Sequence, residues 1–278
     1  MAKLRAMILA AGRGERMRPL TDHTPKPLLV AGGKPLIVWH IERLVRAGIT
    51  DLVINHAHLG AQIETALGDG RQFGAQIRYS PEATALETAG GIAYALHLLG
   101  DEPFAVVNGD IWCDYDFTHL AARAAALQSS GDAAHLVLVN NPAQHPHGDF
   151  HLHNGRLLPT NDQRLTTNDS KLTFSGIGIY QPALFADIVR GTKAPLAPLL
   201  HAQIALGKVT GEHYSGRWVD VGTPQRLEQL DNELRTSQNV SHDYPDTVHL
   251  AVRGELVEPP ATQPEPFDKL RVNGISNK

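Results

Sequence analysis

Short apolar runs alternate with segments of helical periodicity through the first 140 residues. The apolar runs predict buried strands over residues 6–10, 52–54, 77–79, 104–107 and 136–139. The segments between them place apolar side chains three and four residues apart, which predicts helices over residues 35–47, 59–67, 91–99 and 120–127. Strands that alternate with helices form βαβ units, so we expect an α/β fold with a doubly wound, mostly parallel sheet and helices on both faces. Such sheets bind ligands at the carboxyl ends of their strands.

After residue 140 the pattern becomes richer in short strands. Hairpin strands are predicted over residues 149–152, 156–158 and 173–180, with Asn154-Gly155 as a type I′ turn. Strands over 209–214 and 217–221 flank Ser215-Gly216 as a second hairpin, and helices are predicted over 195–206 and 224–235, the latter capped by Thr223. We therefore expect one domain over residues 1–240, with halves at 1–140 and 141–236. Residues 241–278 lack apolar periodicity and are rich in proline, which predicts a disordered or loosely packed tail.

Composition and charge argue against several classes of protein. The 278 residues include 25 Lys and Arg against 29 Asp and Glu, a net charge of −4, whereas sequence-independent binding of nucleic acid rests on a basic face. The single cysteine, Cys113, excludes a disulfide framework and a Cys-rich zinc module. No apolar run approaches the roughly 20 residues of a membrane span, and the N-terminal run ends at Gly12, too early for a secretory signal. We therefore expect a cytoplasmic protein without membrane or nucleic-acid partners.

The loop over residues 11–34 carries the most specific chemistry in the chain. Gly12 and Gly14 follow a predicted strand, where a glycine-rich turn presents backbone N–H groups to phosphate oxygens. Two other phosphate-binding loops fit less well. The dinucleotide fingerprint requires a glycine where this chain has Met17, and a P-loop requires Gly-Lys-Ser/Thr where it has Gly33-Lys34-Pro35. The basic side chains of the loop, which add charge-assisted donors for phosphate, include Arg13, Arg16, Arg18 and Lys26.

Two aspartates stand at the ends of predicted strands. Asp110 closes the segment Val106-Val107-Asn108-Gly109-Asp110, and Asp220 lies between a strand and the helix at 224–235. Mg²⁺ in phosphoryl-type transfer is typically held by one or two carboxylates together with substrate phosphates. Each aspartate taken alone could equally cap a helix.

These motifs resemble those of the sugar-1-phosphate nucleotidyltransferase family. The resemblance covers residues 4–236 and is most specific in Leu9-Ala-Ala-Gly12-Arg-Gly14-Glu-Arg16 and in Pro25-Lys26-Pro27. It implies a Rossmann-like sheet of the GT-A-like type, with a nucleotide-binding half at 1–140 and a smaller β-rich, sugar-binding half at 141–236.

The resemblance also implies roles for individual residues. Arg16 would grip the triphosphate, Lys26 would contact the sugar phosphate and the α-phosphate, and Asp110 and Asp220 would bind Mg²⁺. The nucleotide would contact Ala10, Ala11, Gly12, Arg13, Gly14, Glu82, Thr88, Ala89 and Gly90. The sugar would contact Asn108, Gly148 and Gly176. Many relatives carry Glu-Lys-Pro between the two sugar-binding glycines, but residues 159–165 of this chain have no lysine, so that phosphate ligand is not assigned.

The finer motifs indicate the substrates. Asn55-His56, Tyr79-Ser80-Pro81-Glu82, Leu86-Glu87-Thr88 and Trp112 match family members that use UTP and N-acetylmuramic acid α-1-phosphate in peptidoglycan recycling. The alternatives are another specificity in the family, foremost GTP with mannose 1-phosphate, and a non-catalytic sensor of sugar nucleotides. The lactyl carboxylate of N-acetylmuramic acid requires a cation or backbone donors. The candidates for it are Arg164, Arg217, His145 and His147. No oligomeric state is predicted.

Overall fold

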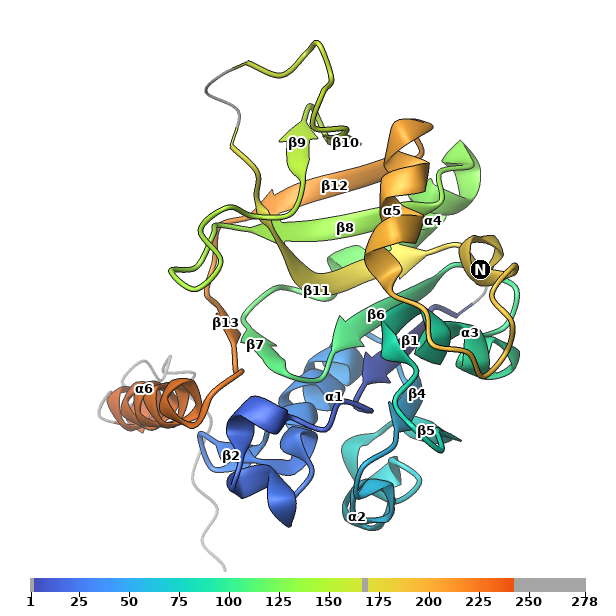
Figure 1. Ribbon diagram of the computed structural model, residues 1–278. Coiled ribbons are helices and arrows are strands. Elements are labelled where there is room, and N and C mark those ends of the chain that lie inside the picture. The colour runs from blue at the N-terminus through green and yellow to red at the C-terminus, as the bar shows by residue number, and fades with distance from the viewer. Residues whose placement is uncertain (1–2, 167–169, 243–278) are drawn as a thin grey trace, which may run out of the picture.

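A nine-stranded sheet runs through the middle of this computed structural model, which describes residues 3–166 and 170–242 (Figure 1). In spatial order its strands are β5 (Gln76–Pro81), β4 (Asp51–His56), β1 (Arg5–Leu9), β6 (Phe104–Asn108), β11 (Thr173–Tyr180), β8 (Ala134–Val139), β12 (Val209–Tyr214), β10 (Arg156–Leu158) and β9 (His151–His153). The first four of these strands are parallel to one another, and β12 is parallel to β8. The predicted α/β fold with a mostly parallel sheet is confirmed.

Helices cover both faces of the sheet, because successive side chains of each strand point to opposite faces. Ile8 of β1 packs on one face with α1 (Leu36–Arg46), α2 (Gly60–Leu67) and α4 (His119–Ser130). Met7 packs on the other face with α3 (Glu87–Leu99) and α5 (Leu196–Ala205). The described 3₁₀ turns are η1 (Glu15–Met17), η2 (Leu20–Asp22), η3 (Lys26–Leu28), η4 (Arg71–Phe73) and η5 (Pro182–Phe185).

A smaller layer lies at one end of the sheet. It contains β7 (Ile111–Cys113) paired with β13 (Trp218–Asp220), the pair β2 (Val30–Ala31) and β3 (Lys34–Pro35), and α6 (Pro224–His242). A third apolar cluster, which includes Met17, Trp112 and Leu230, joins α6 to the N-terminal loop. This packing brings segments from the start, middle and end of the described chain together (Figure 1).

Several elements differ from the sequence-based expectations. The second predicted hairpin is wrong: Ser215-Gly216 form no tight hairpin, because β12 pairs with β8 whereas β13 crosses to β7. The N–H of Asp114 donates to the carbonyl of Arg217 at 3.1 Å and extends that crossing. β11 lies between β6 and β8 and is antiparallel to both. α3 begins at Glu87 rather than at residue 91, and α6 continues beyond residue 235.

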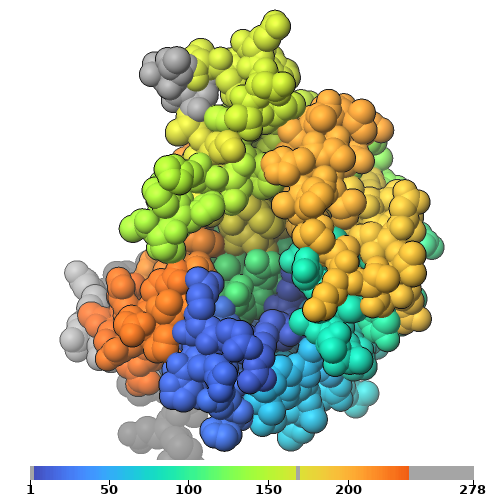
Figure 2. Space-filling model, in the orientation of Figure 1, coloured from blue at the N-terminus to red at the C-terminus, as the bar shows by residue number. Residues whose placement is uncertain are grey.

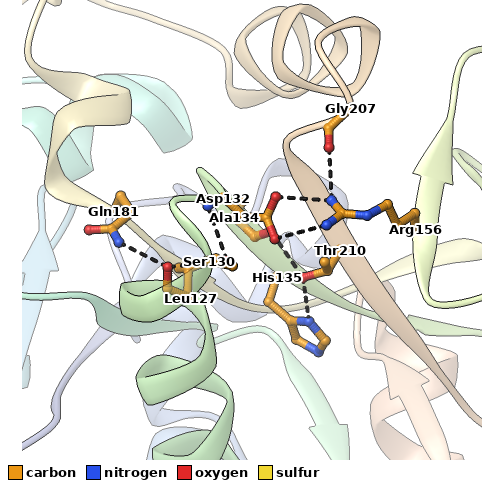
Figure 3. Close-up of polar contacts among 9 residues, drawn as sticks. All are labelled: Leu127, Ser130, Asp132, Ala134, His135, Arg156, Gln181, Gly207 and Thr210. Carbon is orange, nitrogen blue, oxygen red and sulfur yellow. Dashed lines mark hydrogen bonds and ion pairs between the residues drawn. The ribbon is translucent and has the colours of Figure 1, made fainter.

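The predicted hairpin at Asn154-Gly155 is confirmed. Both residues have positive φ, 48° and 76°, as a type I′ turn requires, and they join β9 to β10. Arg156 attaches this hairpin to the sheet by donating to both carboxylate oxygens of Asp132 and to the carbonyl of Gly207 (Figure 3). Burial raises the pKa of Asp132, but the hydrogen bonds from Arg156 and Ser130 outweigh it and hold that pKa below its ordinary value.

The predicted tail after residue 240 lies almost wholly outside the described residues. Among the described residues, no helix is both long enough and apolar enough to span a membrane.

Candidate active site

Two adjoining cavities open at the carboxyl ends of β1 and β6. The first encloses about 370 Å³ and the second about 320 Å³. Arg16, Asn108 and Asp110 line both, so the cavities meet at these three side chains. Figure 2 shows the hollow between the blue N-terminal loop, the orange C-terminal helix and the yellow-green segment near residue 145, with the green chain of β6 and β7 at its floor.

The loop that follows β1 forms one wall of the first cavity. Ala10, Ala11, Gly12 and Gly14 all line it. Gly14 has a φ of 69°, and a Cβ there would lie 3.1 Å from Thr21 Cγ2, so a side chain would be strained in both respects.

The arginines of this loop differ in their partners. Arg13 forms an ion pair with Glu15, and Arg18 forms one with Asp22. Arg16 is exposed, lines both cavities and makes no hydrogen bond or ion pair to any described residue. Its guanidinium is therefore available to an anion in either cavity. Arg13 is not among the lining residues.

A buried lysine faces the first of the two aspartates. Lys26 is 6% exposed, and its Nζ donates to Asp110 Oδ2 at 2.7 Å. The Asp110 side chain is 43% exposed, so its other oxygen remains accessible from the cavities. Lys26 lies in η3, which the Pro25-Lys26-Pro27 motif forms with Pro at the second position of the turn.

Pairing of β7 with β13 brings the second aspartate beside the first. Asp220 is the register partner of Ile111, and the N–H of Val221 donates to the carbonyl of Asp110 at 3.0 Å. Asp220 Oδ2 accepts from Arg226 Nη1 at 2.6 Å. The two aspartates, 110 positions apart in the sequence, are thus neighbours across a two-stranded ladder.

A histidine beneath β7 supports this ladder. His40 of α1 is fully buried, and its Nε2 donates to the carbonyl of Ile111 at 2.8 Å. Burial lowers the pKa of His40 to about 4, so its imidazole is neutral at pH 7 and holds the residue next to Asp110 without adding charge.

The donor set at the ladder fits a magnesium ion. Asp110 and Asp220 each engage one carboxylate oxygen in an ion pair and leave the other without a hydrogen bond to the described residues. Hard oxygen ligands from two carboxylates, completed by phosphate and water, match the preference of Mg²⁺. No group of three or more His, Cys, Asp or Glu side chains with metal-site geometry occurs in the described part of the chain.

The predicted nucleotide-binding residues in the first turn of α3 differ in whether they face the cavity. Thr88 lines the first cavity, together with Ala85 and Glu87. Ala89 and Gly90 are buried, and both donate their N–H to the carbonyl of Ala194 at 3.0 Å, so these groups face away from the cavity.

Glu82 lies behind the cavity wall rather than on it. Its carboxylate accepts from Asn55 Nδ2 at 2.7 Å and from the N–H of Leu86 at 2.9 Å. Burial raises the pKa of Glu82, and these two hydrogen bonds oppose the shift. Asn55 Oδ1 in turn accepts from the N–H of Ala10 at 2.9 Å, so Glu82 supports the glycine-rich loop through Asn55.

The predicted sugar-binding residues also differ in whether they line the cavities. Asn108 lines both cavities. Gly176 lies in a bulge of β11 with a φ of 83°, and a Cβ there would lie 2.7 Å from Asn108 Cγ, so this glycine makes room for Asn108. Gly148 has a φ of 59° and packs against Asn141 and Lys171, and neither glycine is among the lining residues.

Comparison with known proteins identifies the family of this chain. Residues 5–237 match the family model described as nucleotidyl transferase. The chain belongs to this family. It is 55% identical to the N-acetylmuramate alpha-1-phosphate uridylyltransferase of Neisseria meningitidis serogroup B, over 81% of this chain and 96% of that protein. It is 36% identical to the protein of the same name from Caulobacter vibrioides, over 79% and 92% of the two chains. A mannose-1-phosphate guanyltransferase of Xenopus laevis is 27% identical over 93% of this chain and 72% of that protein.

Solved structures share the fold of this chain. A crystal structure titled as a putative glucose-1-phosphate thymidylyltransferase from Bacillus anthracis superposes with a TM-score of 0.72 at 22% identity, over 84% of this chain and 95% of that one. At this identity the likeness concerns the fold.

Sequence reasoning missed several lining residues of this nucleotidyl transferase. Asn55 lines the first cavity, and the second is bordered by Gln144, Thr173 and Trp218. Asn55 carried a usable signal, because it is a polar residue at the end of a buried strand, as Asp110 is. The other three lie on elements whose neighbours the local pattern does not reveal.

Proposed function

We propose that the protein transfers the uridylyl group of UTP to N-acetylmuramic acid α-1-phosphate, forming a UDP-sugar and pyrophosphate. The observation that carries the proposal is the meeting of Arg16, Lys26, Asp110 and Asp220 at the junction of two cavities. One cavity has a glycine-rich wall suited to phosphates and the other lies in the β-rich half. The 55% identity to a uridylyltransferase of that name supports the choice of substrates.

The reaction requires no general base. An oxygen of the sugar phosphate attacks the α-phosphorus of UTP in line, the bond to the bridging oxygen breaks, and pyrophosphate leaves with that electron pair. The attacking oxygen is already anionic at neutral pH, so catalysis consists of positioning and of neutralising charge.

The side chains at the junction divide this work. The unpaired guanidinium of Arg16 binds the triphosphate and the charge that develops as pyrophosphate leaves. Lys26 donates to Asp110. Its ammonium would contact the α-phosphate and the sugar phosphate. Asp110 and Asp220 would hold Mg²⁺, which when bound neutralises phosphate charge as a Lewis acid.

The lining of the first cavity supports the proposed contacts with the nucleotide. Ala10, Ala11, Gly12 and Gly14 approach the phosphates, and Thr88 borders the nucleoside end of the cavity. Asn108 sits between nucleotide and sugar. Because the proposed reaction consumes UTP, we also propose a cytoplasmic location.

Pyrophosphate release separates this function from its alternatives. We expect the highest kcat/KM with UTP and N-acetylmuramic acid α-1-phosphate among combinations of UTP or GTP with this sugar phosphate, N-acetylglucosamine 1-phosphate and mannose 1-phosphate. A preference for GTP with mannose 1-phosphate would assign the guanylyl specificity, and binding without turnover would assign a sensor.

A variant tests the metal ligands. Asp110→Asn should lower kcat by about 100-fold or more, because it removes a charged ligand at the reacting phosphates. Asp101→Asn is the matched control, since Asp101 is exposed and lies outside both cavities. Near-normal turnover of Asp110→Asn at limiting Mg²⁺ would refute the role.

A further inference from the structure

A side chamber opens from the second cavity toward α6. It encloses about 190 Å³ and shares Pro142, Gln144, Trp218 and Asp220 with the second cavity. Its remaining lining residues are Val219, Arg226, Gln229, Leu230 and Glu233. The chamber therefore continues the sugar side of the site, away from the glycine-rich loop.

The chamber combines one cation with an apolar wall. Arg226 is the one Lys or Arg among its lining residues within the described chain. Its side chain is 20% exposed, and Nη1 donates to Asp220 Oδ2. Nη2 and Nε of this guanidinium donate to none of the described residues, so both can bind a second anion. Trp218 and Leu230 supply apolar surface beside it.

The acidic group at the far side of the chamber is already neutralised. Glu233 forms an ion pair with Arg217 and accepts from Gln229 Nε2 at 2.8 Å. The hydrogen bond from Gln229, with that from Arg217, lowers the pKa of Glu233 despite partial burial. An incoming carboxylate thus meets a compensated charge at Glu233 and an available guanidinium at Arg226.

The four side chains that the sequence suggested as partners of a sugar carboxylate either already contact an acidic side chain or lie outside the chamber and the second cavity. Arg164 donates twice to Asp162 and lines neither the chamber nor the second cavity. Arg217 pairs with Glu233, lies over the Trp112 ring at 4.9 Å from its centroid, and lines neither the chamber nor the second cavity. His147 is exposed outside both cavities. His145 does line the second cavity, but its Nε2 contacts Asp149 at 3.0 Å.

We propose that the side chamber binds the carboxylate-bearing lactyl arm of the sugar phosphate, with Arg226 as the specificity-determining residue. This inference rests on the proposed function, which supplies a sugar with such an arm. One edge of the guanidinium holds Asp220 and the other binds the carboxylate, while Trp218 and Leu230 contact the lactyl methyl group. A sugar phosphate without the arm leaves the chamber to water and loses the charge-assisted contact.

Two other roles for Arg226 make different predictions. If it only positions Asp220, or if it binds a phosphate, its loss affects every sugar phosphate alike. A carboxylate contact affects only the sugar that carries the arm. The ratio of kcat/KM for N-acetylmuramic acid α-1-phosphate to that for N-acetylglucosamine 1-phosphate is therefore the decisive quantity.

The experiment measures this ratio with UTP in the wild-type protein, Arg226→Gln and Arg226→Lys. We expect Arg226→Gln to lower the ratio by about 10- to 100-fold, mainly through KM of the carboxylated substrate, and Arg226→Lys to restore part of it. Arg235→Gln, on the same helix and paired with Asp231, is the matched control and should leave the ratio unchanged.

Equilibrium binding provides a readout without turnover. In the absence of metal, calorimetry should show that Arg226→Gln weakens UDP-N-acetylmuramic acid but not UDP-N-acetylglucosamine. An unchanged kcat/KM ratio or equal weakening of both products would overturn the inference and leave the proposed function intact. A wild-type protein that prefers a sugar phosphate without the arm would instead overturn the proposed function itself.

Discussion

Replacing Asn55 by leucine tests how the glycine-rich loop after β1 is held in place. Asn55 is 2% exposed and joins two segments, because its Oδ1 accepts from Ala10 N–H and its Nδ2 donates to Glu82. Leucine has nearly the same volume but forms neither bond. Within the described part of the chain, the carboxylate of Glu82 then keeps only the N–H of Leu86 as a partner, and the Ala10 N–H keeps none.

The cost follows from the two bonds that are lost. A hydrogen bond to a charged group contributes about 1.5–3 kcal/mol and a neutral one about 0.5–1.5 kcal/mol. We expect Asn55→Leu to lower the free energy of unfolding by about 3 kcal/mol, which lowers Tm by about 6–12 °C in a protein of this size. KM for UTP should rise as well, because Ala10 lines the first cavity.

A double-mutant cycle isolates the contact. Chemical denaturation of Asn55→Leu, Glu82→Leu and the double variant should give a coupling energy of about 1.5–3 kcal/mol. Asn232→Leu, an exposed asparagine on α6, should change stability by less than about 0.5 kcal/mol. A coupling near zero, or an unchanged KM for UTP in a folded Asn55→Leu protein, would refute the reasoning.

Three further predictions concern other parts of the molecule. Gly176→Ala should lower stability by about 2–4 kcal/mol in denaturation experiments, because it strains a positive φ and drives Cβ to 2.7 Å from Asn108; a smaller loss than 1 kcal/mol would contradict this packing. The raised pKa of Glu82 means that the folded state holds its proton more tightly, so stability falls as pH rises from the ordinary value of 4.5 through the folded pKa; Glu82→Gln should flatten this part of the pH–stability curve, and an unchanged slope would exclude Glu82 as its source. Truncation after His242 should leave Tm and kcat unchanged, since the predicted domain ends near there, and a large loss of either would show that the tail contributes to the fold.

Local sequence pattern predicted the parallel half of the protein well. Apolar runs and glycine stops located β1, α1 and α2 to within one or two residues. They could do so because each of these elements buries a contiguous stretch of chain, and the period of its apolar residues reflects its own conformation. The glycine-rich loop and the position of Asp110 after β6 were predictable for the same reason, since both depend on what directly follows a strand.

Tertiary structure decided which of these segments meet. The pattern near Ser215-Gly216 is that of a hairpin, yet β13 pairs with β7 and places Asp220 beside Asp110. The sequence predicted that Glu82 contacts the nucleotide. Its contacts with Asn55 and Leu86 instead place it behind the cavity wall. The sequence did not indicate the proposed role of Arg226 in sugar binding, because that role depends on α6 packing against the β7–β13 pair.

The physical reason is the same in each case. Periodicity reports that a residue is buried or exposed, but not which distant segment covers it. The pattern along the chain was therefore enough to predict the strands, the helices and the glycine-rich loop of this protein. The ladder that joins the two aspartates, and the side chamber beside them, arise only when segments more than 100 residues apart pack together.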